Sequence, residues 1–239
     1  MKKIKEYILS AAAWFFGLLT FAVNSLILLF IGIFHTGKMF EGTIKMMCRW
    51  VLFCVGIRLK VTGIENIDPN KQYIIMMNHV NLMDPFVFYA RYPGKVRGIE
   101  EESHFKWPFY GWIIRRIGQV PISRKQGRKA MEALKKAAEL IRNKKEFSMI
   151  ILPEGTRTRS GKLGNFKKGG FLLALEAGLD ILPIVQIGAF RFKRKGSWLM
   201  RPGKIELVIE KSISTSGYSK ENINELIRKT RNSFLEYVE

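Results

Sequence analysis

The first 57 residues and the rest of the chain differ in how apolar and polar positions alternate. Ile8–Phe34 contains no charged residue, and bulky apolar side chains would cover every side of a helix there. Such a helix would be about 40 Å long, whereas the hydrocarbon core of a bilayer is about 30 Å thick. Met39–Leu59 mixes basic with bulky apolar residues, which is typical of an amphipathic helix at a membrane interface. The pattern predicts a two-helix membrane anchor over residues 1–57.

Two other interpretations of this segment are a signal peptide and a pair of soluble core helices. The lysines before Ile8 resemble the start of a signal peptide, but a secretory apolar region spans only about 7–15 residues, and no small-residue cleavage site follows. The two helices could also belong to the core of a soluble protein, although few such helices are apolar on all sides. Asn24 and Ser25, near the middle, leave open whether the segment spans the bilayer or re-enters it.

Beyond residue 57, short apolar runs alternate with helical patterns. The runs typical of strands are Arg58–Thr62, Tyr73–Met77, Val96–Glu100, Ser148–Leu152, Ile181–Ile187 and Lys204–Ile209. Helical patterns cover Pro85–Arg91, Lys106–Ile117, Gly127–Asn143, Gly170–Glu176 and Ser219–Val238, with Ser219 as the N-cap of the last helix. The alternation predicts an α/β domain over residues 58–239, with a central, largely buried β-sheet flanked by helices. Active sites in such sheets lie beyond the strand ends.

The formal net charge of +20 predicts an anionic partner, which could be nucleic acid, an anionic membrane or an acidic protein. No helix-turn-helix, RNA-binding or zinc signature is present, so we expect no nucleic-acid partner. The three histidines, at positions 35, 79 and 104, lack the spacing of metal ligands, and we predict no metal site. Cys48 and Cys54 lie six residues apart in an apolar stretch, which does not favour a mutual disulfide.

The first candidate chemistry lies where the apolar run Tyr73–Met77 ends in Asn78 and His79, shortly before Asp84 and Pro85. Alone, a histidine here is more often structural, and an Asp-Pro pair is typical of a helix N-terminus. A tight loop after a strand, however, can fold the carboxylate back onto the imidazole, which fixes its tautomer and raises its basicity. A histidine held in this way can take a proton from an alcohol, so the loop predicts a general base.

The second candidate lies after Ser148–Leu152, in a turn that carries a carboxylate, a hydroxyl and two guanidinium groups. A surface turn with solvated arginines would also fit this composition. As an anion site, Gly155 permits close approach of the backbone, and Arg157 offers a bidentate fork to phosphate or carboxylate. Glu154 would then position the fork or a substrate hydroxyl.

Four ordered motifs resemble those of the glycerolipid acyltransferases, the family whose best-known members make phosphatidic acid from lysophosphatidic acid. Asn78-His79-x-x-x-x-Asp84 matches the family's first motif, and Leu152-Pro-Glu-Gly-Thr-Arg157 matches the third, usually Phe-Pro-Glu-Gly-Thr-Arg. Gly118-Gln-Val-Pro-Ile-Ser-Arg124 resembles the second motif, and Leu182-Pro-Ile-Val185 stands where the fourth is expected. The motifs extend over roughly residues 57–188, and the N-terminal anchor resembles the family's membrane-attached element.

The resemblance implies an enzyme that transfers a fatty acyl group from an acyl thioester to a free hydroxyl of a lysolipid, above all 1-acylglycerol-3-phosphate. His79 would act as general base on that hydroxyl, while Asp84 orients the imidazole and stabilises the imidazolium. The head group would be held by residues of the second and third motifs: Arg124, Glu154, Gly155, Thr156 and Arg157. Neither cysteine lies near a candidate base, so no acyl-enzyme is expected.

The resemblance implies no bound cofactor, because the acyl donor is a co-substrate, either acyl carrier protein or a coenzyme A thioester. A basic cluster around the second motif would suit either donor or a membrane surface: Arg115, Arg116, Arg124, Lys125, Arg128 and Lys129. Membrane lipids are the remaining expected partner. We expect an inner membrane of bacterial type, with the catalytic domain on the cytoplasmic face.

The chain departs from the family just before Lys106-Trp-Pro-Phe-Tyr-Gly111, where many members have Lys-Glu-Leu and this chain has Glu102-Ser-His104. An acid beside a doubly charged phosphate is repulsive, so a zwitterionic or amino-acid lysolipid is a second candidate acceptor. Asn81, where serine is common in the first motif, is a milder change. Two further classes stay open, a membrane-tethered lipid hydrolase and an anionic-lipid binding protein. The hydrolase would need a nucleophile elbow, and no Gly-x-Ser-x-Gly occurs.

Overall fold

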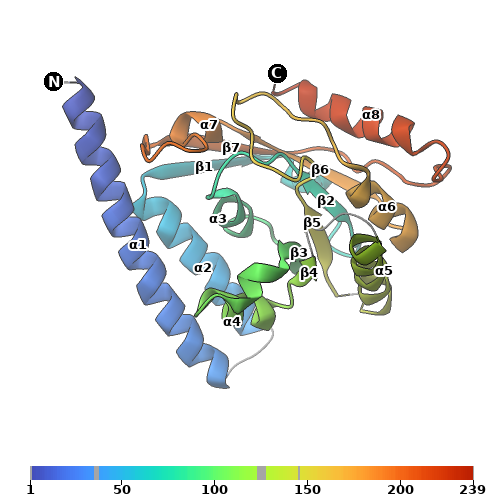
Figure 1. Cartoon of the computed structure of the whole chain (residues 1–239), viewed down its shortest axis with the longest axis horizontal. Coiled ribbons are helices and arrows are strands. Elements are labelled where there is room, and N and C mark those ends of the chain that lie inside the picture. The colour runs from blue at the N-terminus through green and yellow to red at the C-terminus, as the bar shows by residue number, and fades with distance from the viewer. Residues whose placement is uncertain (1, 35–37, 123–127, 145, 239) are drawn as a thin grey trace.

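The structure is a computed structural model that describes residues 2–34, 38–122, 128–144 and 146–238 (Figure 1). Its strands are β1 (Ile57–Thr62), β2 (Ile74–Met77), β3 (Val96–Glu101), β4 (Val120–Ile122), β5 (Ser148–Ile151), β6 (Ile181–Ile187) and β7 (Gly203–Ile209). Its helices are α1 (Lys2–Phe34), α2 (Lys38–Cys54), α3 (Asp84–Tyr89), α4 (Tyr110–Ile117), α5 (Arg128–Asn143), α6 (Lys168–Ala177), α7 (Ala189–Phe192) and α8 (Ile223–Leu235). Two short 3₁₀ turns are η1 (Ile64–Asn66) and η2 (Glu102–Lys106).

The strands form one seven-stranded sheet in the order β1-β7-β6-β2-β5-β3-β4. The strands from β6 to β4 run parallel to one another, whereas β7 is antiparallel to β6 and β1 is parallel to β7. Strand β2 lies in the middle, and all four of its side chains are buried, because helices cover both faces of the sheet. The predicted α/β fold with a largely buried central sheet is therefore confirmed.

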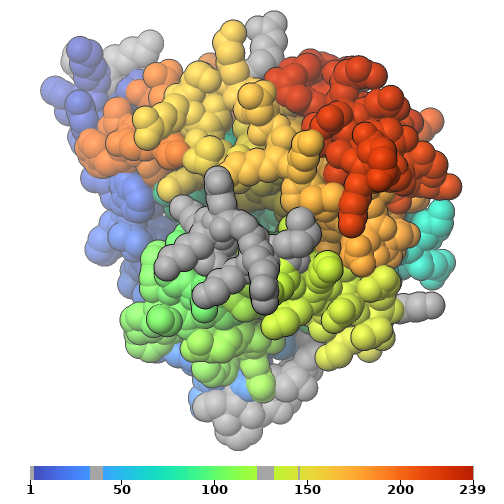
Figure 2. Space-filling view, turned by 45° about the vertical axis from the view of Figure 1, so that its right-hand side comes forward, coloured from blue at the N-terminus to red at the C-terminus, as the bar shows by residue number. Residues whose placement is uncertain are grey.

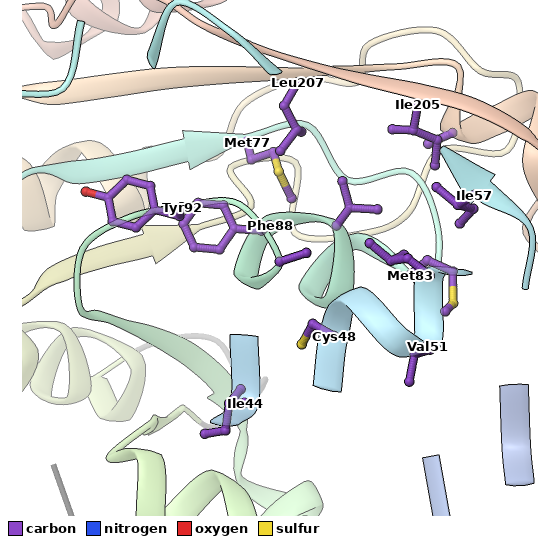
Figure 3. Close-up of a cluster of buried hydrophobic side chains, with 14 of the residues drawn as sticks. Ile44, Cys48, Val51, Ile57, Met77, Met83, Phe88, Tyr92, Ile205 and Leu207 are labelled. Carbon is purple, nitrogen blue, oxygen red and sulfur yellow. The ribbon is translucent and has the colours of Figure 1, made fainter. Parts of the chain in front are cut away.

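Two apolar clusters attach the helices to the two faces of the sheet. On one face, α1 to α4 pack together, and Figure 3 shows Cys48 and Val51 of α2 and Phe88 of α3 on the same side of the sheet as Met77 and Leu207. On the other face, α5, α6 and α8 pack over β2, β5 and β6. The sheet is thus the middle layer of three. The helices cover its two faces, and the loops at its strand ends carry the candidate site.

The first apolar cluster continues across the predicted boundary between anchor and catalytic domain. Buried side chains of α1 and α2 belong to the same cluster as those of α3 and β7. Helix α1 runs without a break past Asn24 and Ser25. The Asn24 amide donates to the main-chain oxygen of Met47 at 3.4 Å, and the Ser25 hydroxyl to that of Phe21 at 2.8 Å. These two polar side chains are therefore satisfied inside the molecule, without a bend.

Two predicted helix boundaries are wrong for reasons of backbone geometry. The predicted helix Lys106–Ile117 is divided into η2 and α4, because Pro108 and the positive φ of Phe109, 59°, interrupt the helical path. The predicted helix Met39–Leu59 ends with α2 at Cys54, since Gly56 takes a φ of 77° and the chain then enters β1.

The predicted N-cap Ser219 is also wrong, because α8 begins only at Ile223, after Asn222. The side-chain oxygen of Asn222 accepts the main-chain N–H of Ser219 at 2.7 Å, which closes a turn before the helix. Ser219 therefore belongs to this turn and lies outside the helix.

Candidate active site

The predicted motifs meet at the edge of the sheet where β2, β3, β5 and β6 end. Parallel strands present their carboxyl ends at one edge, so loops that are far apart in the sequence become neighbours there. Figure 2 shows the yellow segment that follows β5 beside the orange segment that follows β6, with the green segment around residues 100–120 below them. This edge holds the first and third motifs together, beyond the strand ends, where a site is expected from the sequence.

The predicted pair, His79 and Asp84, is in direct contact. The Nδ1 atom of His79 lies 2.7 Å from Oδ2 of Asp84. The His79 side chain is 22% exposed, whereas that of Asp84 is completely buried. No other side chain or main-chain group in the described part of the chain bonds to Nε2 of His79. The imidazole is thus anchored on its inner side and available to a substrate on its outer side.

Asp84 receives donors on both of its oxygens. Besides the histidine, the main-chain N–H groups of Val80 (2.8 Å) and Asn81 (3.0 Å) and the amide of Gln186 (2.9 Å) all donate to it. A carboxylate surrounded by donors can only accept, so Nδ1 of His79 must carry its proton. The lone pair then lies on Nε2, which is the form that a general base requires.

Gln186, which donates to Asp84, was not identified from the sequence. It lies in β6, beside β2, where Met77 pairs with Ile184 in the parallel register. The Asn78 side chain bonds both main-chain groups of Gln186, at 3.0 and 2.7 Å, which fixes its position opposite Asp84. The available signal was a single amide in the otherwise apolar run Ile181–Ile187.

Glu154 connects the loop after β5 to the loop after β2. Its two oxygens accept the main-chain N–H groups of His79 and Gly164, each at 2.7 Å. The main-chain oxygen of His79 in turn accepts the N–H of Thr158 at 2.9 Å. Burial raises the pKa of the Glu154 carboxyl, while the two N–H donors oppose this. Glu154 thus holds the backbone of the catalytic loop, and its contact with substrate stays a prediction.

The rest of the third motif lies at the surface of the same loop. Gly155 is exposed with a φ of 66°, a conformation that glycine adopts without strain. The hydroxyl of Thr156 accepts the Nζ of Lys195 at 2.9 Å. The guanidinium of Arg157 is half-buried and has no hydrogen-bond or ion-pair partner among the described residues. Its donors are therefore available to an anion, and the predicted binding of a head group by Arg157 stays a prediction.

Of the predicted basic cluster, Arg124 and Lys125 lie outside the described residues, as do the side chains of Arg128 and Lys129. The other two arginines bind main-chain oxygens. Arg115 donates to Phe105, and Arg116 donates to Gly32 of α1 at 2.6 Å. The predicted contact of Arg124 with an anion stays a prediction.

The acidic run that departs from the family lies at the carboxyl end of β3. Glu102 is exposed in η2. The Nδ1 atom of His104 bonds to Glu100, and its Nε2 atom lies 4.0 Å from Glu101. The Tyr110 hydroxyl also donates to Glu100, at 3.4 Å, and burial followed by that carboxylate raises the pKa of Tyr110. Glu100 is therefore engaged by His104 and Tyr110, whereas Glu102 lies exposed beside them.

Among the described residues, no group of three or more His, Cys, Asp or Glu side chains is arranged to hold a metal ion. At the carboxyl edge, the one completely buried carboxylate, Asp84, already accepts four donors. Among the described residues at this edge, Nε2 of His79 and the guanidinium of Arg157 have no hydrogen-bond partner in the protein. These suit a hydroxyl and an anion.

Comparison with known proteins assigns the chain to a family. A family model described as Acyltransferase matches residues 58–187, the region that contains the His79 loop, the third motif and Gln186. The chain belongs to the acyltransferase family. The enzyme is 30% identical over 223 residues to the 1-acyl-sn-glycerol-3-phosphate acyltransferase of Pseudomonas aeruginosa, covering 92% of this chain and 82% of that protein.

A second relative of this acyltransferase, from Borreliella burgdorferi and with the same description, is 32% identical over 180 residues, or 74% of this chain and 71% of that protein. The crystal structure of the 1-acyl-sn-glycerophosphate acyltransferase PlsC from Thermotoga maritima matches with a TM-score of 0.82 at 25% identity. That match covers 99% of this chain and 97% of the other. The enzyme class predicted from the four motifs, an acyltransferase of the lysophospholipid family, is confirmed.

Proposed function

We propose that the enzyme transfers a fatty acyl group from an acyl thioester to the free hydroxyl of 1-acylglycerol-3-phosphate, giving phosphatidic acid at a membrane surface. The observation that carries this proposal is the His79–Asp84 pair, whose Nε2 atom has no partner among the described residues. The loop of Arg157, whose guanidinium is likewise without a described partner, is bonded to His79 through the main-chain N–H of Thr158. The relatives from Pseudomonas aeruginosa and Borreliella burgdorferi are both described as acting on this acceptor.

The chemistry follows from the protonation of the imidazole. The acceptor hydroxyl gives its proton to Nε2 of His79 as its oxygen attacks the thioester carbonyl carbon. Asp84 stabilises the imidazolium that forms, because its Oδ2 lies 2.7 Å from Nδ1. When the tetrahedral intermediate collapses, the carbon–sulfur bond breaks and the leaving thiolate takes the proton from Nε2. The products are an ester and a free thiol, and the protein never carries the acyl group.

The head group would lie against the third motif. A planar guanidinium forms two parallel hydrogen bonds to a phosphate, and Arg157 has these donors available. Gly155 is exposed and carries no side chain of its own, although the Lys167 side chain lies beside it. Glu102 is exposed, so solvent screens its charge and weakens its repulsion of a phosphate. The donor would be a thioester of coenzyme A or of acyl carrier protein, both of which are anionic.

Membrane attachment is part of the proposal and rests on apolar side chains that the protein itself leaves uncovered. Among the described residues, Lys3–Gly32 is long and apolar enough to cross a bilayer, and only 22% of its most apolar window is buried inside the molecule. Large exposed apolar side chains occur on both α1 and α2, among them Ile8, Phe15, Leu18, Leu26, Trp50 and Phe53. Such a surface gains free energy in lipid. We propose a bacterial-type inner membrane, with the catalytic domain on its cytoplasmic face.

Thiol release tests the reaction. The purified enzyme is given acyl-coenzyme A or acyl carrier protein thioester, with and without each of a panel of lysolipids. We expect release only with a lysolipid, fastest with lysophosphatidic acid, and complete loss in His79→Ala. His104→Ala, a matched control with 24% side-chain exposure, should stay within a few-fold of the wild type.

Three outcomes would contradict the proposal in different ways. Release without any acceptor would identify a hydrolase, and full turnover in folded His79→Ala would remove the base. A faster reaction with a zwitterionic or amino-acid lysolipid would replace the acceptor while leaving acyl transfer in place.

Vesicle binding tests the attachment. Removing residues 1–57 would uncover the apolar cluster that α1 and α2 share with the sheet, so point variants are the better test. The enzyme should stay on vesicles after a high-salt wash, because burial of apolar surface is not screened. Leu18→Asp combined with Phe53→Asp should release it, and Ile64→Asp, an exposed control on η1, should not. Release of the unaltered enzyme by salt alone would contradict this part of the proposal.

A further inference from the structure

A second cation reaches the third motif from a part of the chain that no motif includes. Lys195 lies in the connection between α7 and β7, and its Nζ atom donates to Thr156 Oγ1 at 2.9 Å and to the main-chain oxygen of Arg157 at 3.2 Å. Because β7 is antiparallel to β6, this connection crosses the same edge of the sheet as the catalytic loop. An ammonium group has three N–H donors, so one remains for a ligand beside Arg157.

The connection that carries Lys195 is fixed by the catalytic loop. The side-chain amide of Asn81 donates to the main-chain oxygens of Ala189 (2.8 Å) and Lys193 (3.3 Å). A serine at position 81, as is common in the family, has a single hydroxyl proton and could make only one of these bonds. The change at Asn81 therefore ties this particular connection to the His79 loop.

The anchor helix fixes the connection from its other side. The ammonium group of Lys193 is bonded to the main-chain oxygen of Ser197 and lies 5.5 Å from the ring centre of Trp14 in α1. The indole N–H of Trp14 donates to the main-chain oxygen of Trp198 at 2.6 Å. Residues 193–198 are thus held between α1 and the His79 loop, whereas surface loops are in general more mobile.

The charges of this corner are not balanced by the protein. Among the described residues, no carboxylate forms an ion pair with Arg157, Lys193 or Lys195. Lys193 is buried, and this burial together with the charge of Arg157 lowers its pKa. Like charges held together in partly buried positions cost free energy unless a counter-ion joins them. The cluster therefore has the charge pattern of an anion site.

We propose that Lys195 binds the phosphate of the acceptor together with Arg157, so that each of the two negative charges of the phosphomonoester meets one cation. Only the identity of the ligand rests on the proposed function. Many family members have a lysine at the position where this chain carries the acidic run that ends at Glu102. Lys195 would supply the missing positive charge from the opposite side of the sheet edge. Lys193 and Asn81 hold the connection in place.

The test compares Lys195→Gln, which keeps a donor for Thr156 but removes the charge, with Lys195→Arg, which restores the charge. The matched control is Arg194→Gln, an exposed neighbour. For lysophosphatidic acid we expect KM to rise about tenfold in Lys195→Gln, with kcat within about twofold, because about 1.4 kcal/mol of binding is lost. Lys195→Arg should recover most of the loss, and Arg194→Gln should behave as the wild type.

Two further measurements separate the possible sources of the phosphate. The 3′-phosphate of coenzyme A is also a phosphomonoester, so the KM for acyl-coenzyme A should stay unchanged in Lys195→Gln. The reaction with 1-monoacylglycerol, which lacks the phosphate, should stay unchanged too. An increase in the KM for acyl-coenzyme A would show that Lys195 binds the acyl donor. An equal loss of kcat with both acceptors would show that Lys195 only stabilises the loop of the third motif. Either result would overturn the proposal, as would an unaltered Lys195→Gln.

Binding of sn-glycerol 3-phosphate gives a readout that does not require turnover. Its dissociation constant, measured by calorimetry on the full-length protein, should rise about tenfold in Lys195→Gln and stay constant in Arg194→Gln. If the wild type failed to acylate lysophosphatidic acid yet showed this difference, the proposed function would fail while the phosphate site stood. Equal binding by the wild type and Lys195→Gln would overturn the site itself.

Discussion

Two corners of the same sheet edge differ in how their polar groups are satisfied. At the corner after β2, the oxygens of Asp84 accept four donors, and every donor comes from the protein. At the corner formed by Arg157, Lys193 and Lys195, cations gather without a carboxylate partner among the described residues. The first corner is complete before substrate arrives, whereas the second is completed only by an anion.

The difference separates the groups that carry out the reaction from the groups that bind the acceptor. A base must have its tautomer and orientation fixed before the reaction, because reorganisation during the reaction costs rate. A head-group site gains affinity when its donors have no competing partner in the free protein. We therefore expect changes at the first corner to affect kcat and changes at the second to affect the KM of the acceptor.

The largest effect should come from Asp84→Asn. An amide has one acceptor oxygen, and its NH₂ group would donate to Nδ1 of His79 and move the imidazole proton to Nε2. We expect kcat to fall by about 10³–10⁴-fold, the range found when the acid of such a pair is replaced by its amide. Initial rates at saturating acceptor measure this, and a melting curve checks that the protein stays folded. A loss below about tenfold in a folded variant would show that the carboxylate does not set the tautomer.

A smaller effect is expected from Gln186→Met, which keeps the shape of the side chain and removes one donor to Asp84. A hydrogen bond to a charged group contributes about 1.5–3 kcal/mol, so kcat should fall by about ten- to a hundredfold with the KM of the acceptor unchanged. Gln72→Met is the matched control, because that amide donates to the main-chain oxygen of Phe147 at the opposite end of the sheet. A change in the KM of the acceptor alone would show that Gln186 contributes to acceptor binding, and would contradict the division between the two corners.

The smallest effect concerns stability and Glu154, which joins the two corners. Burial raises the pKa of this carboxyl above the ordinary glutamate value of 4.5, so the folded protein binds its proton more tightly than the unfolded chain does. As pH rises from 4.5 through the raised pKa, this group should therefore lower the free energy of unfolding. The melting temperature of the wild type minus that of Glu154→Gln should fall over this window. A difference that rises with pH would contradict the assignment.

The sequence was sufficient where neighbouring residues form the structure. The strand that ends in Asn78 and the Asp-Pro pair that opens α3 are local patterns, and the His79–Asp84 contact closes within five residues. The buried parallel strands were recognisable from their uninterrupted apolar runs, as in Ile181–Ile187, which was predicted to the residue. The third motif likewise holds its carboxylate and its arginine within four positions.

The sequence was insufficient where the register of the sheet brings distant residues together. Gln186 reaches Asp84 only because β6 pairs with β2, and Lys195 reaches Thr156 only because the chain reverses between β6 and β7. In the sequence, Lys195 was one of many basic residues in a chain of net charge +20. The strand β4 was missed because of Pro121, which is tolerated there since β4 is an edge strand.

The most direct test of the division between the corners is the ratio of kcat/KM for lysophosphatidic acid to that for 1-monoacylglycerol, which has the hydroxyl but no phosphate. Asp84→Asn should lower both values by the same factor and leave the ratio unchanged, because it acts on the hydroxyl that both acceptors share. Arg157→Ala should lower the ratio about a hundredfold, or about 2.7 kcal/mol, by removing the bidentate contact to the phosphate. A ratio unchanged in Arg157→Ala, or altered as strongly in Asp84→Asn, would contradict this account.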